Sequence, residues 1–212
     1  MSRPQCIARA PRSTRGVSIV SAAILVAVGG CSLLRSDVPP TTFYILSATS
    51  ERGQITAGRP LALGLGPVTL PPYLNRPEMV RRVAANQLSF DEFNRWSEPL
   101  KDNVVRVLAA DLDALLGLDR IIFYPWYSST PMDYSVAVAV LRFEPQPNGT
   151  AVLDARWSIG NGRGEQLANR DAHFERPAGA PAQTAAALSA MLGDLATEIG
   201  TALRTLDGAR GK

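Results

Sequence analysis

The chain has few side chains that could form covalent cross-links or bind metals. Only two of its 212 residues are cysteines, Cys6 and Cys31. Both stand near the amino terminus, so the rest of the sequence offers no pair for a disulfide or for a cysteine-based zinc site. We therefore expect the folded part of the chain to be stabilised by side-chain packing alone.

Histidine is scarcer still, because His173 is the only one. It stands between Ala172 and Phe174 in a pattern typical of a solvated strand, and no G-x-S-x-G motif accompanies it. Asp111 and Asp113 are two residues apart in a predicted helix and should face different ways. A hydrolase needs a nucleophile and a base, which this sequence does not bring together. We predict no catalytic residue, no metal site and no cofactor.

No apolar run reaches the ~20 residues that a membrane-spanning helix requires. The best candidate covers residues 17–28, follows four arginines without any acidic residue, and leads into small residues. A basic region, a short apolar region and small residues in this order are typical of a secretory signal peptide. The sequence therefore predicts that residues 1–30 are removed.

The residues before Cys31 are Val28, Gly29 and Gly30, which resemble the lipobox of bacterial lipoproteins. The resemblance predicts lipidation of Cys31; the alternative is an ordinary signal peptide with an incidental cysteine. A lipidated cysteine of this class carries three acyl chains, and each buried methylene contributes about 0.8 kcal/mol, so the anchor would be effectively permanent. Ser32 follows in place of the aspartate that retains such lipoproteins at the inner membrane. We expect the protein at the periplasmic face of the outer membrane.

An excess of positive charge is also missing once the signal peptide is removed. The whole chain has 22 basic and 19 acidic residues, and four of the basic ones but none of the acidic ones lie in residues 1–30. The remaining 18 basic and 19 acidic residues nearly balance. Nucleic acid is therefore excluded as an expected partner, because binding to phosphates requires a basic surface.

The mature sequence divides into a lipidated cysteine with a tether, residues 31–40, a single domain, residues 41–206, and a flexible tail, residues 207–212. Alternating apolar residues and turn residues predict strands over 41–48, 60–68, 79–83, 87–90, 120–126, 133–146, 150–161 and 166–177. Periodic leucines predict two helices, one capped by Ser97 and ending at Gly117 and one over residues 181–206.

Residues 136–141 are apolar on both faces, which predicts a central strand. Gly64 and Gly66 leave one face of their strand bare, which would permit close approach of another backbone. The order of strands and helices predicts an α+β fold, a single-domain two-layer sandwich in which a mostly antiparallel sheet packs against two main helices.

Residues 67–112 resemble a known family, the ABC-type transport auxiliary lipoproteins, which include the PqiC-like proteins. The resemblance rests on Leu-Pro-x-Tyr-Leu-x-Arg-Pro, Asn-x-Leu and Phe-x-Arg-Trp-x-Glu-Pro-Leu, which are here Leu70, Pro71, Tyr73, Leu74, Arg76, Pro77, Asn86, Leu88, Phe93, Arg95, Trp96, Glu98, Pro99 and Leu100. The lipobox and the early TFYIL segment also fit this family.

The resemblance implies a non-catalytic lipoprotein of the outer membrane. It would work with an MCE-domain protein and an ABC or PqiA-like permease of the inner membrane to move lipids across the periplasm. The best candidate for a partner-binding surface is the loop 71–77 together with Arg95 and Trp96, which lie further along the chain. Its residues are Pro71, Pro72, Tyr73, Leu74, Arg76, Pro77, Arg95 and Trp96. Interface anchors are often such aromatic, aliphatic and arginine side chains.

The sequence leaves two alternatives open. The same residues could be structural, with Trp96 packed beneath the start of the helix and Arg95 paired to Glu98 at the surface. The protein could also be a stand-alone periplasmic lipoprotein that binds a small apolar ligand in a pocket lined by Leu61, Leu63, Tyr73, Val136 and the helices. Whether the chain forms a homo-oligomer is likewise open.

Overall fold

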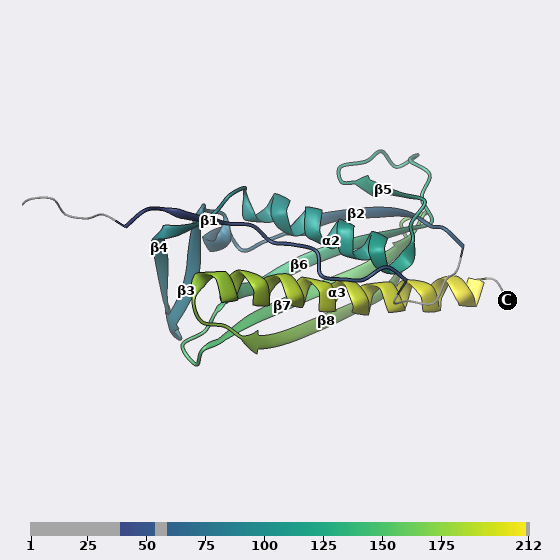
Figure 1. Cartoon of the computed structure of the whole chain (residues 1–212). Helices are drawn as coiled ribbons and strands as arrows, with labels where there is room; N and C mark the ends of the chain where they lie inside the picture. Colours follow the sequence, from purple (N-terminus) through teal and green to yellow (C-terminus); the bar gives the residue numbers. More distant parts are fainter. Residues whose placement is uncertain (1–38, 54–58, 211–212) are drawn as a thin grey trace, which may run out of the picture. The chain divides into compact units, whose positions relative to one another are not determined.

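The computed structural model describes residues 39–53 and 59–210. The predicted signal peptide, Cys31 and most of the tether lie outside these residues. From Pro40 onward the chain forms one compact unit with its own core. The unit contains two mixed β-sheets and two long helices (Figure 1), so the predicted α+β single domain is confirmed.

The larger sheet has five strands in the order β5-β2-β6-β7-β8. These strands are β5 (Arg120–Phe123), β2 (Ala62–Thr69), β6 (Tyr134–Pro145), β7 (Thr150–Asn161) and β8 (Gln166–Pro177). Strand β6, predicted to be central, is third of the five and is buried at Val136, Val138 and Val140. Pairing is antiparallel from β6 to β8, but β2 runs parallel to both β5 and β6. The sheet is therefore more mixed than the sequence predicted.

The smaller sheet has three strands in the order β1-β4-β3. Strands β3 (Glu78–Ala84) and β4 (Gln87–Trp96) form the predicted antiparallel hairpin, with Ala85 and Asn86 at the turn. Strand β1 (Thr42–Tyr44) pairs in parallel with the end of β4. This sheet is the platform from which the predicted partner loop, residues 71–77, projects, because that loop runs directly into β3.

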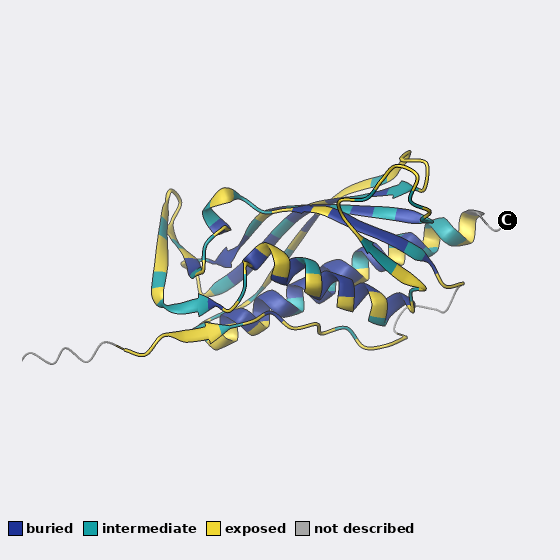
Figure 2. Cartoon of the chain, turned by 90° about the horizontal axis from the view of Figure 1, so that it is seen from above, coloured by how far each residue is buried: buried dark blue, intermediate teal, exposed yellow. Residues whose placement is uncertain are grey.

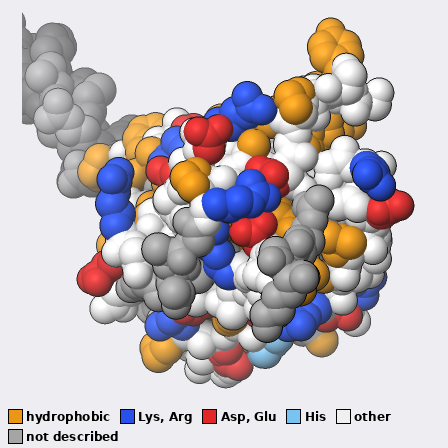
Figure 3. Space-filling model, turned by 90° about the vertical axis from the view of Figure 1, so that its right-hand side faces the viewer, with side chains coloured by type: hydrophobic (Ala, Val, Ile, Leu, Met, Phe, Trp, Pro, Cys, Tyr) orange, Lys and Arg blue, Asp and Glu red, His pale blue; other side chains and the backbone are white. Residues whose placement is uncertain are grey.

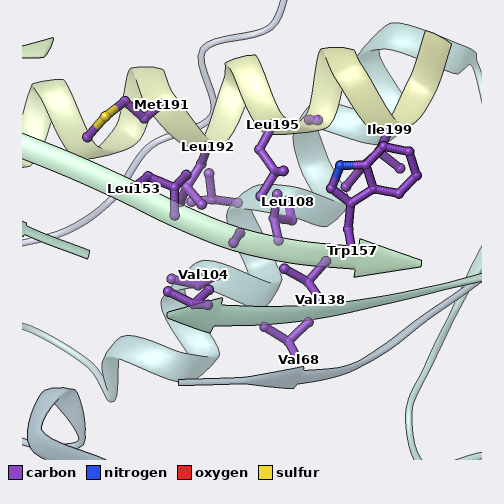
Figure 4. Packing of buried hydrophobic residues seen from close by; sticks show 14 of the residues in the cluster. Val68, Val104, Leu108, Val138, Leu153, Trp157, Met191, Leu192, Leu195 and Ile199 are labelled. Carbon is purple, nitrogen blue, oxygen red and sulfur yellow. The ribbon is translucent and has the colours of Figure 1, made fainter. Parts of the chain in front are cut away.

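Helices α2 (Leu100–Leu116) and α3 (Pro181–Arg210) lie beside each other on one face of the larger sheet (Figure 1). Figure 2 shows that buried residues are concentrated along both helices and the central strands. In Figure 4, Ile199 of α3 lies beside Trp157 of β7, Leu195 of α3 lies close to Leu108 of α2, and Leu192 of α3 lies over Leu153 of β7. Burial of such side chains contributes about 1.5–3 kcal/mol each, so this layer carries most of the stability.

The ends of both helices differ partly from the sequence prediction. Ser97 does not cap α2; Pro99 precedes the helix without any side-chain cap, and its carbonyl accepts the amide of Asn103 at 3.1 Å. Gly117 ends α2 as predicted, in the left-handed region with φ 58°. Helix α3 continues through residues 207–210, which we expected to belong to the tail; the helix includes Gly208, and Asp207 pairs with Arg59 at 3.1 Å.

The segment 45–53, here called the strap, is the clearest error in the strand prediction. Residues 41–48 were predicted as one strand, but β1 ends at Tyr44 and the strap then runs lengthwise between α2 and α3 (Figure 1). Its amides bind helical side chains instead of a neighbouring strand. Ser47 donates to Ser189 Oγ at 3.2 Å, and Thr49 and Ser50 both donate to Asp111 Oδ1 at 2.8 Å.

Candidate functional surface

The predicted partner loop forms one surface with the end of β4. A short 3₁₀ turn, η2 (Pro72–Leu74), opens the loop, and Leu74 donates its amide to the Pro71 carbonyl at 3.0 Å. The amide of Trp96 donates to the Pro77 carbonyl at 2.7 Å. This bond joins the two ends of the sequence motif, so the structure brings together residues that are about twenty positions apart.

A groove of about 310 Å³ lies at this junction. Its lining residues are Asn75, Arg76, Pro77, Trp96, Ser97, Glu98 and Pro99. Trp96 itself is 5% exposed, so it supports the groove from within the fold and offers little of its own surface. Three of the predicted residues, Arg76, Pro77 and Trp96, thus line the groove. The four others were not predicted for this surface, although Asn75 and Ser97 stand next to residues that were.

The arginines beside the groove are held by neighbouring side chains. The guanidinium of Arg76 lies 3.6 Å from the centre of the Phe90 ring and 3.4 Å from Glu78. Arg95 pairs with the same carboxylate at 3.1 Å. The predicted pairing of Arg95 with Glu98 is wrong, because Glu98 pairs with Arg106 at 2.9 Å. Glu78 therefore fixes two arginines in the orientation that borders the groove.

Tyr73 and Leu74 turn inward from the same loop. Leu74 is 1% exposed, and the Tyr73 hydroxyl donates to Glu144 Oε2 at 2.9 Å. The Glu144 carboxylate is fully buried and also accepts bonds from Arg82 Nε at 3.0 Å and from the Phe143 amide at 2.9 Å. Burial, and then the bond to Glu144, raises the pKa of Tyr73 to about 12. These residues fix the loop to β6 and present little surface to a partner.

Sequence reasoning missed Glu144. A single acidic residue at the end of the long apolar strand β6 was the available signal, because a buried charge requires partners.

The apolar pocket considered for a stand-alone carrier is not formed by its predicted residues. Leu61, Leu63 and Val136 are completely buried in the core, and the Tyr73 hydroxyl is bound to Glu144. Within the described part of the chain, these four side chains therefore enclose no open cavity that could admit a ligand.

His173 lies on the exposed side of β8, as predicted. Its side chain is 62% exposed, and its Nδ1 lies 2.5 Å from Asp154 Oδ1. Across residues 39–53 and 59–210, no cluster of three or more histidine, cysteine or acidic side chains could bind a metal ion. In the same residues, no helix is both long enough and apolar enough to cross a bilayer.

The fold matches solved structures at low sequence identity. One is a crystal structure of protein XCC0632 from Xanthomonas campestris, with a TM-score of 0.70 and 18% identity over 81% of this chain and 100% of that one. Another is a crystal structure of an uncharacterized protein, with a TM-score of 0.62 and 19% identity over 78% of this chain and 99% of that one. These matches show a shared fold.

Sequence comparison gives the family. No curated protein matches the chain at a significant level. The family described as "ABC-type transport auxiliary lipoprotein component" matches residues 44–200, which include the groove, the larger sheet, most of the smaller sheet, α2 and most of α3. The match covers well over half of the sequence, so the chain belongs to the ABC-type transport auxiliary lipoprotein family.

Proposed function

We propose that this protein is the non-catalytic docking subunit of an MCE-type intermembrane lipid transport system, anchored at the outer membrane through lipidated Cys31. Membership in a family of transport auxiliary lipoproteins supports the general role and a lipid anchor. Our proposal adds three specific features to this family role: an MCE-domain partner, an ABC or PqiA-like permease, and a location at the outer membrane. A lipid that crosses water exposes its acyl chains, so a transport path needs a fixed attachment at the far membrane.

The groove between residues 75–77 and 96–99 is the observation that carries this proposal. It is built from the stretch by which the chain resembles the PqiC-like proteins, and a backbone bond between Trp96 and Pro77 closes it. Its support is rigid, because Tyr73, Glu144 and Glu78 fix the loop and both arginines. Binding sites carried by loops on such a scaffold lose little conformational entropy on association.

The role of the groove in partner binding can be tested with substitutions that fill it with larger side chains. Asn75 and Ser97 line it and are exposed, and no bond of either side chain is needed for the fold described above. The double variant Asn75→Arg, Ser97→Arg should fold normally but lose co-purification with the MCE-domain protein of the same transport system. Cells that carry the variant should show the membrane-permeability defect of a deletion strain.

The matched control adds the same two charges elsewhere. Gln87 and Ser89 are exposed on β4 outside the groove, so Gln87→Arg, Ser89→Arg should leave partner binding and permeability intact. Equal co-purification of the groove variant and the control would refute the groove as the docking site. Native mass spectrometry that found stoichiometric lipid on the chain without any partner would favour the stand-alone carrier instead.

A further inference from the structure

A second surface, formed by the aromatic loop (residues 123–132), is not used by the proposed docking groove. Aromatic residues make up 7% of the chain, yet four of the five residues from Phe123 to Tyr127 are aromatic. Three of them are largely exposed: Phe123 is 51%, Tyr124 56% and Tyr127 83% accessible. No charged residue occurs from residue 121 to residue 132. Exposed aromatic groups of this density usually mark an interaction surface.

The fold positions this loop through the two glycines of β2. A Cβ atom at Gly66 would lie 2.5 Å from Tyr124 Cβ, and one at Gly64 would lie 2.7 Å from Met132 Sδ. The bare strand face noted in the sequence is therefore covered by side chains of the aromatic loop, where we had expected another backbone.

Further contacts fix the loop along its length. The Tyr124 amide donates to the Leu65 carbonyl at 3.0 Å, and Thr130 donates to the Tyr127 carbonyl at 2.9 Å. The Tyr124 and Trp126 rings pack edge to face, with centres 5.4 Å apart. The exposed aromatic groups are thus presented by an ordered loop, and Figure 3 shows hydrophobic side chains projecting from this end of the domain.

The geometry points to the interfacial region of a lipid bilayer as the partner of this loop. Tyrosine and tryptophan combine an apolar ring with a polar group, and both are enriched where membranes meet water. The loop itself carries no charge from residue 121 to residue 132, so none of its own side chains is an ion that would oppose insertion. Arg120, which donates to the Pro131 carbonyl at 2.9 Å, is the cation beside the loop, and its long side chain can keep the guanidinium at the headgroup level of a zwitterionic surface. A bilayer is also within reach, since the family consists of lipoproteins.

The loop and the start of the domain lie near opposite ends of α3 (Figure 1). Strand β1 is near the amino end of this helix, and the aromatic loop is near its carboxyl end. An ideal helix of 30 residues spans about 45 Å. A lipid anchor before β1 and an inserted loop at the other end would together orient the domain along the membrane.

Vesicle binding tests this inference directly. The unit from Pro40 onward has its own core, so it can be studied without the lipid anchor. It should bind vesicles of zwitterionic phosphatidylethanolamine and phosphatidylcholine, and added salt should not weaken this binding. Tryptophan emission should shift to shorter wavelength. Trp96 and Trp157 are buried, so Trp126→Phe should abolish the shift.

Variants separate the loop from other exposed aromatic groups. Phe123→Ser, Tyr127→Ser should lower the partition coefficient about tenfold, because it removes two exposed apolar rings. Phe90→Ser, which removes a 43% exposed ring from the smaller sheet, should bind like the unaltered unit. Tyr127→Ser alone gives a check without risk to folding and should weaken binding measurably.

Three outcomes would overturn the inference. They are no binding to zwitterionic vesicles, equal binding by the loop variant and the unaltered unit, and binding that needs anionic lipid and disappears with salt. The first outcome would leave a protein as the partner of the aromatic loop. None of these results bears on the docking groove, which lies on other residues.

Discussion

At the scale of single residues, Tyr73 links the loop 71–77 to the larger sheet through Glu144. The pKa of Tyr73 is raised to about 12, whereas tyrosine in an unfolded chain titrates near 10. The folded state therefore retains this proton at a pH where the unfolded state has lost it. The stabilisation is fully present below pH ~10 and is lost as the pH rises toward 12.

Because the pKa of Tyr73 is raised in the folded state, the wild-type protein and a variant without the Tyr73 hydroxyl should differ in stability at alkaline pH. Between pH ~10 and ~12, the free energy of unfolding of the wild-type protein should fall by about 1 kcal/mol more than that of Tyr73→Phe, after a discount for partial exposure. Urea denaturation at several pH values measures it. Tyr127→Phe removes an exposed hydroxyl and should keep the wild-type pH dependence. Parallel curves for wild type and Tyr73→Phe would contradict the raised pKa of Tyr73, which burial and then the bond to Glu144 produce.

Gly66 is the residue at which the position of the aromatic loop is most constrained. Its φ of 123° is unfavourable for any other residue, and a Cβ atom would also collide with Tyr124. Gly66→Ala should therefore cost about 2–4 kcal/mol, from backbone strain and overpacking together. Gly53 has φ 77° with open space around it, so Gly53→Ala should cost only about 1 kcal/mol. If denaturant unfolding gave the same loss of unfolding free energy for Gly66→Ala and Gly53→Ala, the collision with Tyr124 would be ruled out.

The sequence pointed to the loop 71–77 as a candidate surface but could not give the direction of its side chains. Arg76, Pro77 and Trp96 were predicted for the surface and do line the groove. The inward direction of Tyr73 could not be predicted, because its hydrogen-bond partner, Glu144, is 71 residues away in the chain. Strand and helix periods assign side chains to faces, but a loop has no period from which such an assignment could be made.

At the scale of elements, the strap depends on one buried carboxylate of α2. Asp111 Oδ1 accepts both the Thr49 and the Ser50 amides, and its side chain is fully buried. Asp111→Ala should lower the local opening free energy of the strap by about 2 kcal/mol, because hydrogen bonds to a charged group are lost. Amide hydrogen exchange at Thr49 and Ser50 measures this opening.

Asp113 provides the control for the strap on the same helix. Asp113 is exposed and Asp111 is buried, so the two face different ways, as their spacing predicted. No side-chain bond joins Asp113 to the strap among the described residues. Asp113→Ala should leave amide exchange in the strap unchanged. Equal acceleration in the two variants would mean that α2 itself, and not the Asp111 carboxylate, controls the strap.

The accuracy of the element predictions followed the strength of the local pattern. The bounds predicted for β7 and β8 match the structure because turn residues flank long alternating segments. The strap has a strand-like sequence, but its partners are helical side chains far along the chain. Ser97 has the right chemistry for a cap, yet its amide donates to the Tyr44 carbonyl and the helix begins three residues later.

At the scale of the whole molecule, connectivity explains why the sheet is mixed. The chain leaves β2, forms the β3–β4 hairpin and returns through α2 before β5, so β2 and β5 run in the same direction. A crossover through a helix produces a parallel pair, whereas the short turns after β6 and β7 produce antiparallel ones. The alternation of elements gave the fold class, but pairing across a crossover cannot be read from the period of either strand.

The two cysteines allow a matched test of the anchor that the whole proposed function requires. Cys31 follows the lipobox-like residues, whereas Cys6 lies in the predicted signal peptide. Cys31→Ala should remove the protein from the outer-membrane fraction of a density gradient, and Cys6→Ala should leave it there.

Three acyl chains, at about 0.8 kcal/mol for each buried methylene, contribute far more membrane-binding free energy than a few aromatic side chains of a loop. The Cys31→Ala protein should therefore retain at most reversible binding through the aromatic loop, which washing removes. An uncleaved chain would be found with the inner membrane, which the same gradient separates. Outer-membrane retention of Cys31→Ala after washing would contradict lipidation at Cys31 and the orientation of the domain derived from it.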